Sequence, residues 1–594
     1  VNFNLHQHYP ITQVNDMKKR WSLQEDVDRG VIGLLSLQLG VKPLLSRILY
    51  LRGIKTWEQA KNFFRPELSQ LHDPFLMNGM DAAIKRIEAA IEQNEKILIY
   101  GDYDVDGTTA VALVYSFFKS YYKNLEFYIP DRYLEGYGIS FKGIDYAKDN
   151  DFKLIIALDC GIKSIDKIDY ANEKGVDFII CDHHLPGETI PNAVAVLDPK
   201  METSKYPFNE LSGCGIGFKL IQGFAKRKNL PEESLVEYLD LVAVSIAADI
   251  VPIVGENRIL AYYGLQVLNN RNRKGFDAIL KLAAFTKKLT ISDIVFTIAP
   301  RINAAGRIAS GNTAVELLIS DNPVDALNSS EEINNTNSER KTLDQNITKH
   351  AFSMIDEDKD NYLKKSTVLY HPDWHKGVVG IVASRLTEKY YRPTVVLTSS
   401  NGMATGSARS VKDFDVYKAI EACSDLLEQY GGHKYAAGLT LKTENIQLFI
   451  EKFEMIVSQT IEDHLLTPEV EIDAEIKLVD LDAKFLRILK QLAPFGPGNM
   501  APVFLARGVK DKGYARVVGN NHLKLDIYQD DIKFSFPAIA FNAGEKYEQL
   551  LEKSAFDICF TVEENEFNGN VTLQFNIKDI KFEHQKTLSP NNLL

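Results

Sequence analysis

The stretch ILIYGDYDVDGTTA, residues 97–110, begins as an apolar run and continues into three aspartates on alternate positions, Asp102, Asp104 and Asp106. A short apolar run bounded by turn-forming residues is typical of a buried strand. Carboxylates that lie close together repel one another, and burial removes their hydration. The stretch therefore predicts a buried strand with a cation among the carboxylates at its end.

Three later runs repeat this pattern, because each is apolar and leads into an aspartate: KLIIALDCG (153–161), VDFIICDHH (176–184) and AVAVLDP (193–199). Apolar runs that alternate with segments of helical length predict a parallel sheet covered by helices on both faces. A single aspartate at a strand end is most often a helix cap or a turn residue. Several at one sheet edge favour a binding site, since ligands of such sheets bind beyond the carboxyl ends of the strands.

The candidate ligands at this edge combine carboxylates with imidazoles. Asp249 ends a further apolar run, LVAVSIAADIVP (241–252), whose length fits either a helix or a strand. Oxygen ligands suit Mg²⁺ or Mn²⁺, and the imidazoles favour Mn²⁺. Two such ions about 3.5–4 Å apart can stabilise the attacking and leaving oxygens of a phosphoester. The sequence thus predicts a metal-dependent phosphoesterase with these candidate catalytic residues: Asp102, Asp104, Asp106, Asp159, Asp182, His183, His184 and Asp249.

Local geometry gives two further expectations for this site. Alternation along an extended segment would point Asp102, Asp104 and Asp106 the same way, and a turn at Gly107 could present two of them to different ions. Strand geometry would send the adjacent rings of VDFIICDHH to opposite faces. We therefore expect at most one of the two histidines to be a ligand, unless a turn intervenes.

Polarity and periodicity divide the rest of the chain. The segment after residue 322 is polar but keeps apolar residues at roughly helical spacing, which favours a long helix between two lobes over a disordered linker. STVLYH and PTVVLTSS then predict strands of a second α/β region. The expected domains are a mostly helical segment packed on the catalytic lobe (1–85), the catalytic α/β domain (86–322), the connecting helix (323–362), the second α/β domain (363–458) and a β-barrel (465–585).

The barrel is predicted from period-two alternation in VEIDAEI, HLKLDIY, IKFSFPAIAF, FDICFTVEE and VTLQFNIKDIKF, with Asn568-Gly569 as a hairpin turn between the last two. Its aromatic residues are more often core than base-stacking platforms in such domains. We therefore expect burial for Tyr514, Phe534, Phe536 and Phe541.

Composition excludes several classes of protein. The chain has 594 residues, 45% of them apolar and 25% charged, as expected for a folded protein of several domains. No run approaches the about 18 apolar residues of a membrane helix, and no secretion signal is apparent, so we expect a cytoplasmic protein. Five scattered cysteines without C-x-x-C spacing predict free thiols. The net charge of −12 requires that any nucleic-acid groove gather basic residues locally.

The motifs DYDVDG, LDCG, CDHH and AADIVP resemble those of the DHH phosphoesterase superfamily. Within it, five later motifs resemble the RecJ family of bacterial single-stranded-DNA exonucleases, in the same order: PRINAAGR (300–307), HPDWHKGVVGIVASRL (371–386), GSARS (406–410), GGHKYAAG (431–438) and PFGPGN (494–499). The resemblance implies a DHH-associated second domain facing the first across a narrow cleft, and an OB-fold barrel. It also implies that Asp159 bridges two ions, that Asp102, Asp182 and His184 support the ligands or contact phosphate, and that the ligands are Asp104, Asp106, Asp159, His183 and Asp249.

The activity implied by the resemblance is 5′-to-3′ degradation of single-stranded DNA to 5′-mononucleotides, with Mn²⁺ or Mg²⁺, in bacterial DNA repair and recombination. A monomer acting on free 5′ ends, with single-stranded-DNA-binding protein as a partner, is expected. Side-chain chemistry adds candidate phosphate donors, Arg132, Arg301, Arg307, Ser407, Arg409 and His433. Two alternatives stay open: a phosphodiesterase of short oligonucleotides or cyclic dinucleotides, which needs no barrel, and a noncatalytic scaffold.

Overall fold

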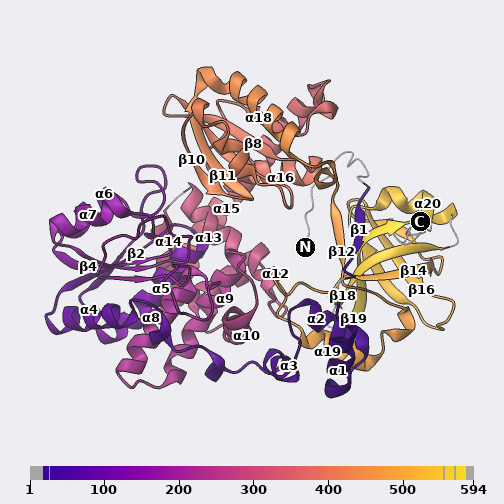
Figure 1. Ribbon diagram of the computed structural model, residues 1–594, viewed down its shortest axis with the longest axis horizontal. Helices are drawn as coiled ribbons and strands as arrows, with labels where there is room; N and C mark the ends of the chain where they lie inside the picture. Colours follow the sequence, from indigo (N-terminus) through magenta and orange to yellow (C-terminus); the bar gives the residue numbers. More distant parts are fainter. Residues whose placement is uncertain (1–17, 26, 309, 553–554, 568–569, 583–594) are drawn as a thin grey trace. The chain divides into compact units, whose positions relative to one another are not determined.

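The computed structural model describes residues 18–25, 27–308, 310–552, 555–567 and 570–582 (Figure 1). The chain forms two compact units. The first contains Val1–Phe64, Ile347–Ala493 and Ala501–Leu594, and the second contains Arg65–Asn346 and Pro494–Met500. The chain therefore passes between the units four times, and the short segment 494–500 belongs to the second unit although its sequence neighbours belong to the first.

The second unit is built on a five-stranded parallel sheet with the order β3-β2-β4-β5-β6. This confirms the predicted α/β domain, and each of the four apolar runs is a strand. The strands are β2 (Lys96–Gly101), β3 (Leu125–Tyr128), β4 (Phe152–Leu158), β5 (Asp177–Cys181) and β6 (Ala195–Leu197).

Helices cover both faces of this sheet (Figure 1). Ile97 and Ile99 pack in a core cluster with α5 (Val105–Tyr121) and α8 (Gly213–Arg227), whereas Leu98 and Tyr100 pack with α6 (Phe141–Asp149) and α7 (Ile165–Lys174). Because successive side chains of a strand point to opposite faces, both sets are buried. This is why the strands are continuous apolar runs rather than alternating ones.

The strand order changes direction between β2 and β4. From β2 the chain first adds β3 on one side and then crosses to β4 on the other. In open α/β sheets such a switch point leaves a crevice beyond the carboxyl ends of the two strands. Asp102 and Asp159 follow directly after β2 and β4, so the fold brings both to this crevice.

Helices complete the second unit. The run that ends at Asp249 is helical, which resolves the open choice between helix and strand. The segment after residue 322 forms a single helix of 35 residues, as predicted. The remaining principal helices are α4 (Met80–Glu92), α9 (Leu239–Ala248), α10 (Gly255–Asn269), α11 (Lys274–Leu282), α13 (Ala299–Ile308), α14 (Gly311–Ile319) and α15 (Pro323–Glu357), whose last turns belong to the first unit.

The predicted N-terminal domain is divided between the two units. β1 (Arg20–Leu23) pairs in parallel with β12 (Glu469–Ile472), and helices α1 (Arg29–Leu39), α2 (Pro43–Leu51) and α3 (Trp57–Phe64) follow it. The described residues up to Phe64 belong to the first unit, whereas those from Arg65 belong to the second. In the described part of the chain, no single helix is long and apolar enough to cross a membrane, although the bent pair α1–α2 reaches that length and composition jointly.

The first unit contains the predicted second α/β region. Its sheet has the order β10-β11-β9-β8-β7. STVLYH and PTVVLTSS contain the strands β7 and β8, as predicted. Among the described strands of this sheet, these two are the only parallel pair. The elements are β7 (Thr367–Tyr370), α16 (Val379–Tyr390), β8 (Thr394–Ser400), β9 (Met403–Arg409), α17 (Val416–Glu421), β10 (Leu427–His433), β11 (Ala436–Lys442) and α18 (Ile446–Thr460).

The C-terminal strands close into a barrel, because β14 pairs with both β18 and β16 and the ladder runs β14-β18-β19-β17-β16-β14. The turn predicted at Asn568-Gly569 lies outside the described residues. Phe536 is 8% exposed, as expected of core, but Tyr514 and Phe534 are 62% and 50% exposed, so their expected burial is wrong. The strands are β13 (Ala474–Glu475), β14 (Phe504–Asp511), β15 (Arg516–Val518), β16 (His522–Tyr528), β17 (Phe536–Ala540), β18 (Phe556–Phe567) and β19 (Asn570–Lys581), with α19 (Ala483–Gln491) and α20 (Tyr547–Glu552).

Candidate metal centre

The segment after β2 turns directly into a helix. Asp104 is the N-cap of α5, and its Oδ1 accepts the backbone N–H of Gly107 at 3.0 Å. Asp106 lies in the first helical turn, so the three aspartates do not alternate along an extended chain as expected. A Cβ at Gly107 would lie 2.5 Å from the carbonyl oxygen of Asp102, which is why this tight turn needs glycine.

Asp106 is held by three hydrogen-bond donors. Its Oδ1 accepts from the backbone N–H of Cys214 at 2.7 Å and from Ser245 Oγ at 2.6 Å, and its Oδ2 accepts from the N–H of Gly213 at 2.7 Å. The two backbone donors open helix α8, whose dipole also favours a negative charge. The sequence analysis missed these residues, although Ser212 followed by Gly213 carries a signal for a helix N-terminus.

His183 faces three carboxylates. Its Nε2 lies 3.2 Å from Asp159 Oδ1, 3.6 Å from Asp106 Oδ2 and 3.7 Å from Asp249 Oδ2. Its Nδ1 lies 3.0 Å from the carbonyl oxygen of Leu211, which can only accept a hydrogen bond. The ring is therefore protonated at Nδ1 when neutral, and the lone pair on Nε2 points at the carboxylates, as in a metal ligand.

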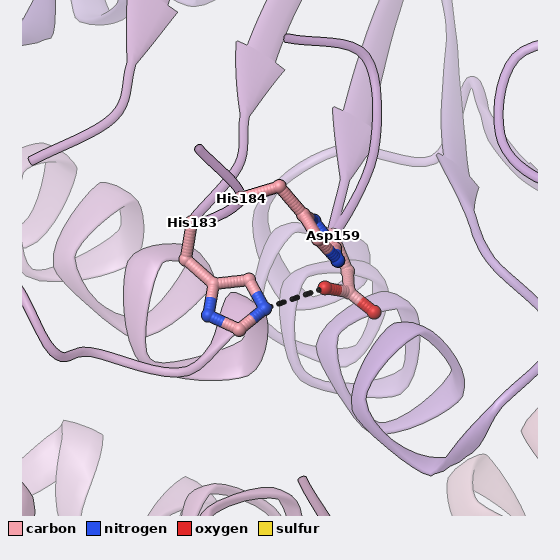
Figure 2. Close-up of side chains that lie close together, drawn as sticks. All are labelled: Asp159, His183 and His184. Atoms are coloured by element: carbon pink, nitrogen blue, oxygen red, sulfur yellow. Dashed lines mark ion pairs between the residues drawn. The ribbon is translucent and has the colours of Figure 1, made fainter. Parts of the chain in front are cut away.

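His184 lies on the same side of the chain as His183, because the chain turns after β5. The two ring centroids are 4.7 Å apart, so the turn that the expectation allowed for does intervene, and the rings do not lie on opposite faces. Figure 2 shows both rings beside Asp159, and ligand atoms of these three residues lie within 4.8 Å of one another. His184 Nδ1 is 2.7 Å from Asp182 Oδ1, and its Nε2 is 3.2 Å from the hydroxyl of Tyr137.

The pKa values of Asp182 and His184 are both strongly shifted by their interaction. Burial by itself would lower the pKa of His184, but the hydrogen bond and charge of Asp182 raise that pKa to about 9. Burial by itself would raise the pKa of Asp182, but the hydrogen bond from His184 and the N–H of Ile162 hold that pKa at about 2. The pair is therefore ionised through the neutral range in the metal-free protein.

For Asp159 and Asp249, burial and mutual repulsion outweigh the interactions that favour the ionised carboxylate. Burial, with repulsion from Asp106 and Asp104, raises the pKa of Asp159 well above its usual range and that of Asp249 to about 8. Asp159 Oδ1 and Asp102 Oδ2 are buried without a hydrogen-bond partner. Such orphaned oxygens are costly unless a cation binds them. The residues present thus fit a divalent metal.

Two overlapping groups offer the ligand atoms. One consists of Asp159, His183 and His184, and the other of Asp106, His183 and Asp249. Hard oxygen ligands with a small number of imidazoles suit Mn²⁺ and Mg²⁺. Asp104 adds a further carboxylate whose pKa is raised by burial and by Asp106. The structure therefore gathers all five predicted ligands, and Asp102, Asp182 and His184, at one sheet edge.

The candidate phosphate donors of the second unit separate into two places. Arg132 lies over the ring of Tyr103 at 4.9 Å and lines a cavity of ≈ 170 Å³ together with the start of α14. Burial and the charge of Asp102 raise the pKa of Tyr103 to about 12, and the charges of Arg132 and Arg307 oppose this rise. Arg301 is 9% exposed and donates instead to the carbonyl oxygen of Thr297 and to Asn334 Oδ1, within the fold.

The candidates of the first unit lie on one sheet. Arg409 Nη1 donates to Ser407 Oγ at 2.7 Å, and a Cβ on Gly380 of α16 would lie 3.0 Å from Arg409 Nη2. The register pairs Arg409 with Ala436 and Ala436 with His433, so Arg409 and His433 share one row and one face of the sheet. A guanidinium beside the first turn of a helix, with an imidazole on the same face of the sheet, can bind a phosphate.

Comparisons with known proteins cover most of the chain. The families described as DHH family, N-terminal domain, DHHA1 domain and RecJ OB domain match residues 96–246, 363–459 and 472–579. The chain is 35% identical to the single-stranded-DNA-specific exonuclease RecJ of Bacillus subtilis over 95% of its own length and 71% of that protein. It is 31% identical to the Escherichia coli protein of the same name over 91% and 96% of the two chains.

The structure of the chain is also similar to solved structures of RecJ. A crystal structure of RecJ in complex with Mn²⁺ from Thermus thermophilus superposes with a TM-score of 0.81 at 27% identity, over 95% of this chain and 79% of that one. A structure of the same protein with Mg²⁺ gives a TM-score of 0.75 at 26% identity, over 95% and 78% of the two chains.

Proposed function

Because this chain belongs to the RecJ family of DHH phosphoesterases, we propose that it is a single-stranded-DNA-specific exonuclease that degrades from the 5′ end and releases 5′-mononucleotides. The observation that carries the proposal is the arrangement around His183, whose Nε2 faces three carboxylates within 3.2–3.7 Å. That geometry is what a hydrolytic metal site requires, and the barrel gives the chain a second surface for a long strand.

The proposed cofactor is Mn²⁺ or Mg²⁺, with two ions per site. Ions bound there would lower the pKa of a water molecule and offset the charge that develops on the phosphate. The chain's own contribution is to fix the ligands before substrate arrives: Ser245 and the α8 N-terminus orient Asp106, and the Leu211 carbonyl orients His183. The proposed ligands are Asp104, Asp106, Asp159, His183 and Asp249.

His184 and Asp182 have a different proposed role. Asp182 accepts hydrogen bonds from the backbone N–H groups of His183 and His184 and from His184 Nδ1, so it fixes the turn that carries both rings. The side chain of His184 is 44% exposed, so its Nε2 edge can reach a phosphate oxygen of the substrate. Asp102, which is buried, supports a different loop, the one between β3 and α6, by accepting from the N–H of Gly138 at 3.3 Å.

Selection of a strand end needs a site for a terminal phosphate. In the second unit, Arg132 and the α14 N-terminus supply cationic and N–H donors around the ≈ 170 Å³ cavity, and the charge of Arg307 acts on Tyr103, which lines it. In the first unit, Ser407, Arg409 and His433 supply a second set. We propose that these two sets hold backbone phosphates of the strand, and that Arg301 stabilises the junction of α13 and α15 instead.

The barrel supports the choice of single-stranded DNA over short substrates. Tyr514 and Phe534 are exposed, and Arg516 and Lys524 are paired across β15 and β16. Exposed aromatic rings and cationic side chains on one domain are the usual means of binding unpaired bases and their phosphates. A phosphodiesterase of cyclic dinucleotides or short oligonucleotides would have no use for such a surface.

The decisive experiment is product analysis on single strands labelled at either end, with and without Mn²⁺. The proposal predicts that 5′ label appears first as mononucleotide and that chelation of the metal stops the reaction. Release of 3′ label first would refute the polarity, and equal turnover of long strands and cyclic dinucleotides would favour the alternative activity.

Three further features belong to the proposal: a monomeric state, action in the bacterial cytoplasm during repair and recombination, and single-stranded-DNA-binding protein as a partner. Light scattering of the purified chain tests the first. Co-purification from lysate treated with nuclease tests the partner, because an association that persists without DNA must be direct.

A further inference from the structure

Residues 494–500 form a loop of the second unit although they lie in sequence between α19 and β14 of the first. We refer to Pro494–Met500 as the PFGPGN loop. It packs on Pro252, Ile253 and Val254, which follow shortly after the candidate ligand Asp249. The sequence analysis found this motif only as part of a resemblance and assigned it no chemistry.

The contact between the loop and this segment is tight. The N–H of Ile253 donates to the carbonyl oxygen of Pro497 at 2.7 Å. A Cβ on Gly496 would lie 2.4 Å from Ile253 Cδ1, and a Cβ on Gly498 would lie 3.0 Å from Val254 Cγ1. Ile253 is fully buried, at 0% exposure, so its side chain has little room to move. Glycines at these positions allow the loop to reach the segment.

The loop is also closed on itself. Gly496 and Asn499 exchange both backbone hydrogen bonds, at 3.1 and 2.9 Å. The buried side chain of Asn499, which is 1% exposed, donates through Nδ2 to the carbonyl oxygen of Pro494 at 2.8 Å. Arg258 of α10 donates to the same oxygen at 3.5 Å. These hydrogen bonds fix the conformation of the loop, so it can act as a rigid support.

The segment that the loop supports is strained. Asp249 is the C-cap of α9, and the next residue, Ile250, has φ +60°. The left-handed conformation is unfavourable for an L-residue, and it is least suited to β-branched side chains. Ile250 is 65% exposed, so packing of its own side chain does not offset this cost. The conformation must be held by neighbouring contacts, and the anchored Ile253 lies three residues downstream.

We propose that the PFGPGN loop is a positioning element for the metal ligand Asp249. By fixing Ile253 it holds Ile250 in the left-handed conformation, and this orients Asp249 toward His183 Nε2, which lies 3.7 Å from Asp249 Oδ2. The inference rests on the proposed function, since the ligand role of Asp249 is part of it. Displacement of the carboxylate would remove one ligand without removing its charge.

The test introduces a steric clash between the loop and Ile253 and then removes it with a second substitution. The affinity of the whole chain for Mn²⁺ is measured by electron paramagnetic resonance of the free ion. Gly496→Ala places a methyl group against Ile253 Cδ1 and should weaken binding about tenfold or more, as loss of supporting contacts does at other metal sites. The double variant Gly496→Ala/Ile253→Val removes that δ-methyl group and should recover most of the affinity. Ile253→Val alone should bind nearly as the wild type does.

Two controls separate the outcomes. Gly33→Ala is the matched glycine control, because a Cβ there meets nothing within 4 Å, and it should leave binding unchanged. Asp249→Ala tests the ligand role itself: unchanged binding in this variant would refute the assignment of Asp249 as a ligand, independently of the loop. Weakened binding in Asp249→Ala together with wild-type binding in folded Gly496→Ala would overturn the positioning role.

Asn499→Ala covers the case in which Gly496→Ala does not fold. It removes the bond from Nδ2 to the Pro494 carbonyl without adding bulk, so it should also weaken Mn²⁺ binding. Thermal unfolding in EDTA is recorded for every variant. Wild-type Mn²⁺ affinity in folded Asn499→Ala, or no recovery in the folded double variant, counts against the proposal.

Discussion

His183 Nε2 lies 3.2 Å from Asp159 Oδ1, while Nδ1 of the same ring is committed to the carbonyl oxygen of Leu211. The neutral ring therefore carries its proton on Nδ1, and the lone pair of Nε2 points at Asp159 Oδ1. That oxygen is buried and has no hydrogen-bond partner. Neither group satisfies the other when the ring is neutral, since both are acceptors. A cation between or beside them removes the conflict.

Asp159→Asn should therefore stabilise the metal-free protein and abolish the metal-dependent reaction. Asp159 has its pKa raised well above its usual range by burial and by Asp106, so its ionised form destabilises the folded state at neutral pH. In EDTA the variant should unfold at a higher temperature than the wild type. The stabilisation that Mn²⁺ gives the wild type should shrink or disappear in the variant, because a ligand stabilises only through its affinity for the folded state. A lower unfolding temperature in EDTA would contradict this account.

Ser245→Ala should weaken metal binding through Asp106. The serine hydroxyl donates to Asp106 Oδ1 at 2.6 Å, and its loss leaves that oxygen with one donor. We expect a decrease of about 10–100-fold in Mn²⁺ affinity or activity. Ser330→Ala is the matched control, because Ser330 is buried and its hydroxyl has no hydrogen-bond partner. Equal effects of the two substitutions would mean that the loss at Ser245 is only structural.

The Asp182–His184 pair should make the metal-free protein depend on pH in a defined direction. The pKa of His184 is raised from 6.5 to about 9, so its contribution to stability is complete below about pH 6.5 and is lost as pH rises through 9. The pKa of Asp182 is lowered from 3.8 to about 2, so its contribution is complete above about pH 4 and is lost as pH falls toward 2. In EDTA, urea unfolding of the wild type relative to His184→Asn should show a difference that declines between pH 6.5 and 9. A constant difference would show that the pair does not titrate in this way.

Substitution of the exposed aromatic residues of the barrel should weaken the binding of long strands and leave the cleavage of short substrates unchanged. Tyr514→Ala and Phe534→Ala should each weaken binding of a long single strand by about 1–3 kcal/mol, the usual contribution of one base–aromatic stack. Cleavage of a dinucleotide should stay close to the wild-type rate. Tyr362→Ala removes an aromatic side chain that is 81% exposed and lies outside the barrel, and it should change neither measurement. Equal losses on long and short substrates would give the two barrel residues a structural role.

Ile250→Asn should stabilise the fold, because asparagine tolerates the left-handed conformation better than a β-branched residue does. The expected gain is about 1 kcal/mol, seen as a higher unfolding temperature in EDTA. A lower unfolding temperature would mean that the exposed isoleucine makes a compensating contact.

The strands of the parallel sheet, and the edge of that sheet at which the candidate ligands lie, could be predicted because short stretches of sequence are enough to identify them. Strands buried on both faces must be continuously apolar, and each aspartate follows its strand directly. β14 was missed for an equally physical reason: Gly508 has φ +61° and the register shifts between Ala506 and Val509, so a bulge interrupts the alternation.

What the sequence could not show depends on contacts distant in the chain. The backbone donors of Gly213 and Cys214 carry no side-chain signature, and they reach Asp106 across more than 100 residues. The opposite faces expected for His183 and His184 assumed that β5 continues, whereas it ends at Cys181. Arg301 and Arg307 are the same residue type six positions apart on one helix, and it is the burial of Arg301 that gives it a structural role.

The order of the chain has a consequence for how this enzyme is made. Every proposed ligand is synthesised by residue 249, yet the catalytic unit is complete only when Met500 has left the ribosome. A nascent or prematurely terminated chain that stops before Pro494 would carry all its ligands without the support beneath Asp249. If the loop has the proposed role, such a chain would bind the metal more weakly than the finished one, so competence would arrive late in translation.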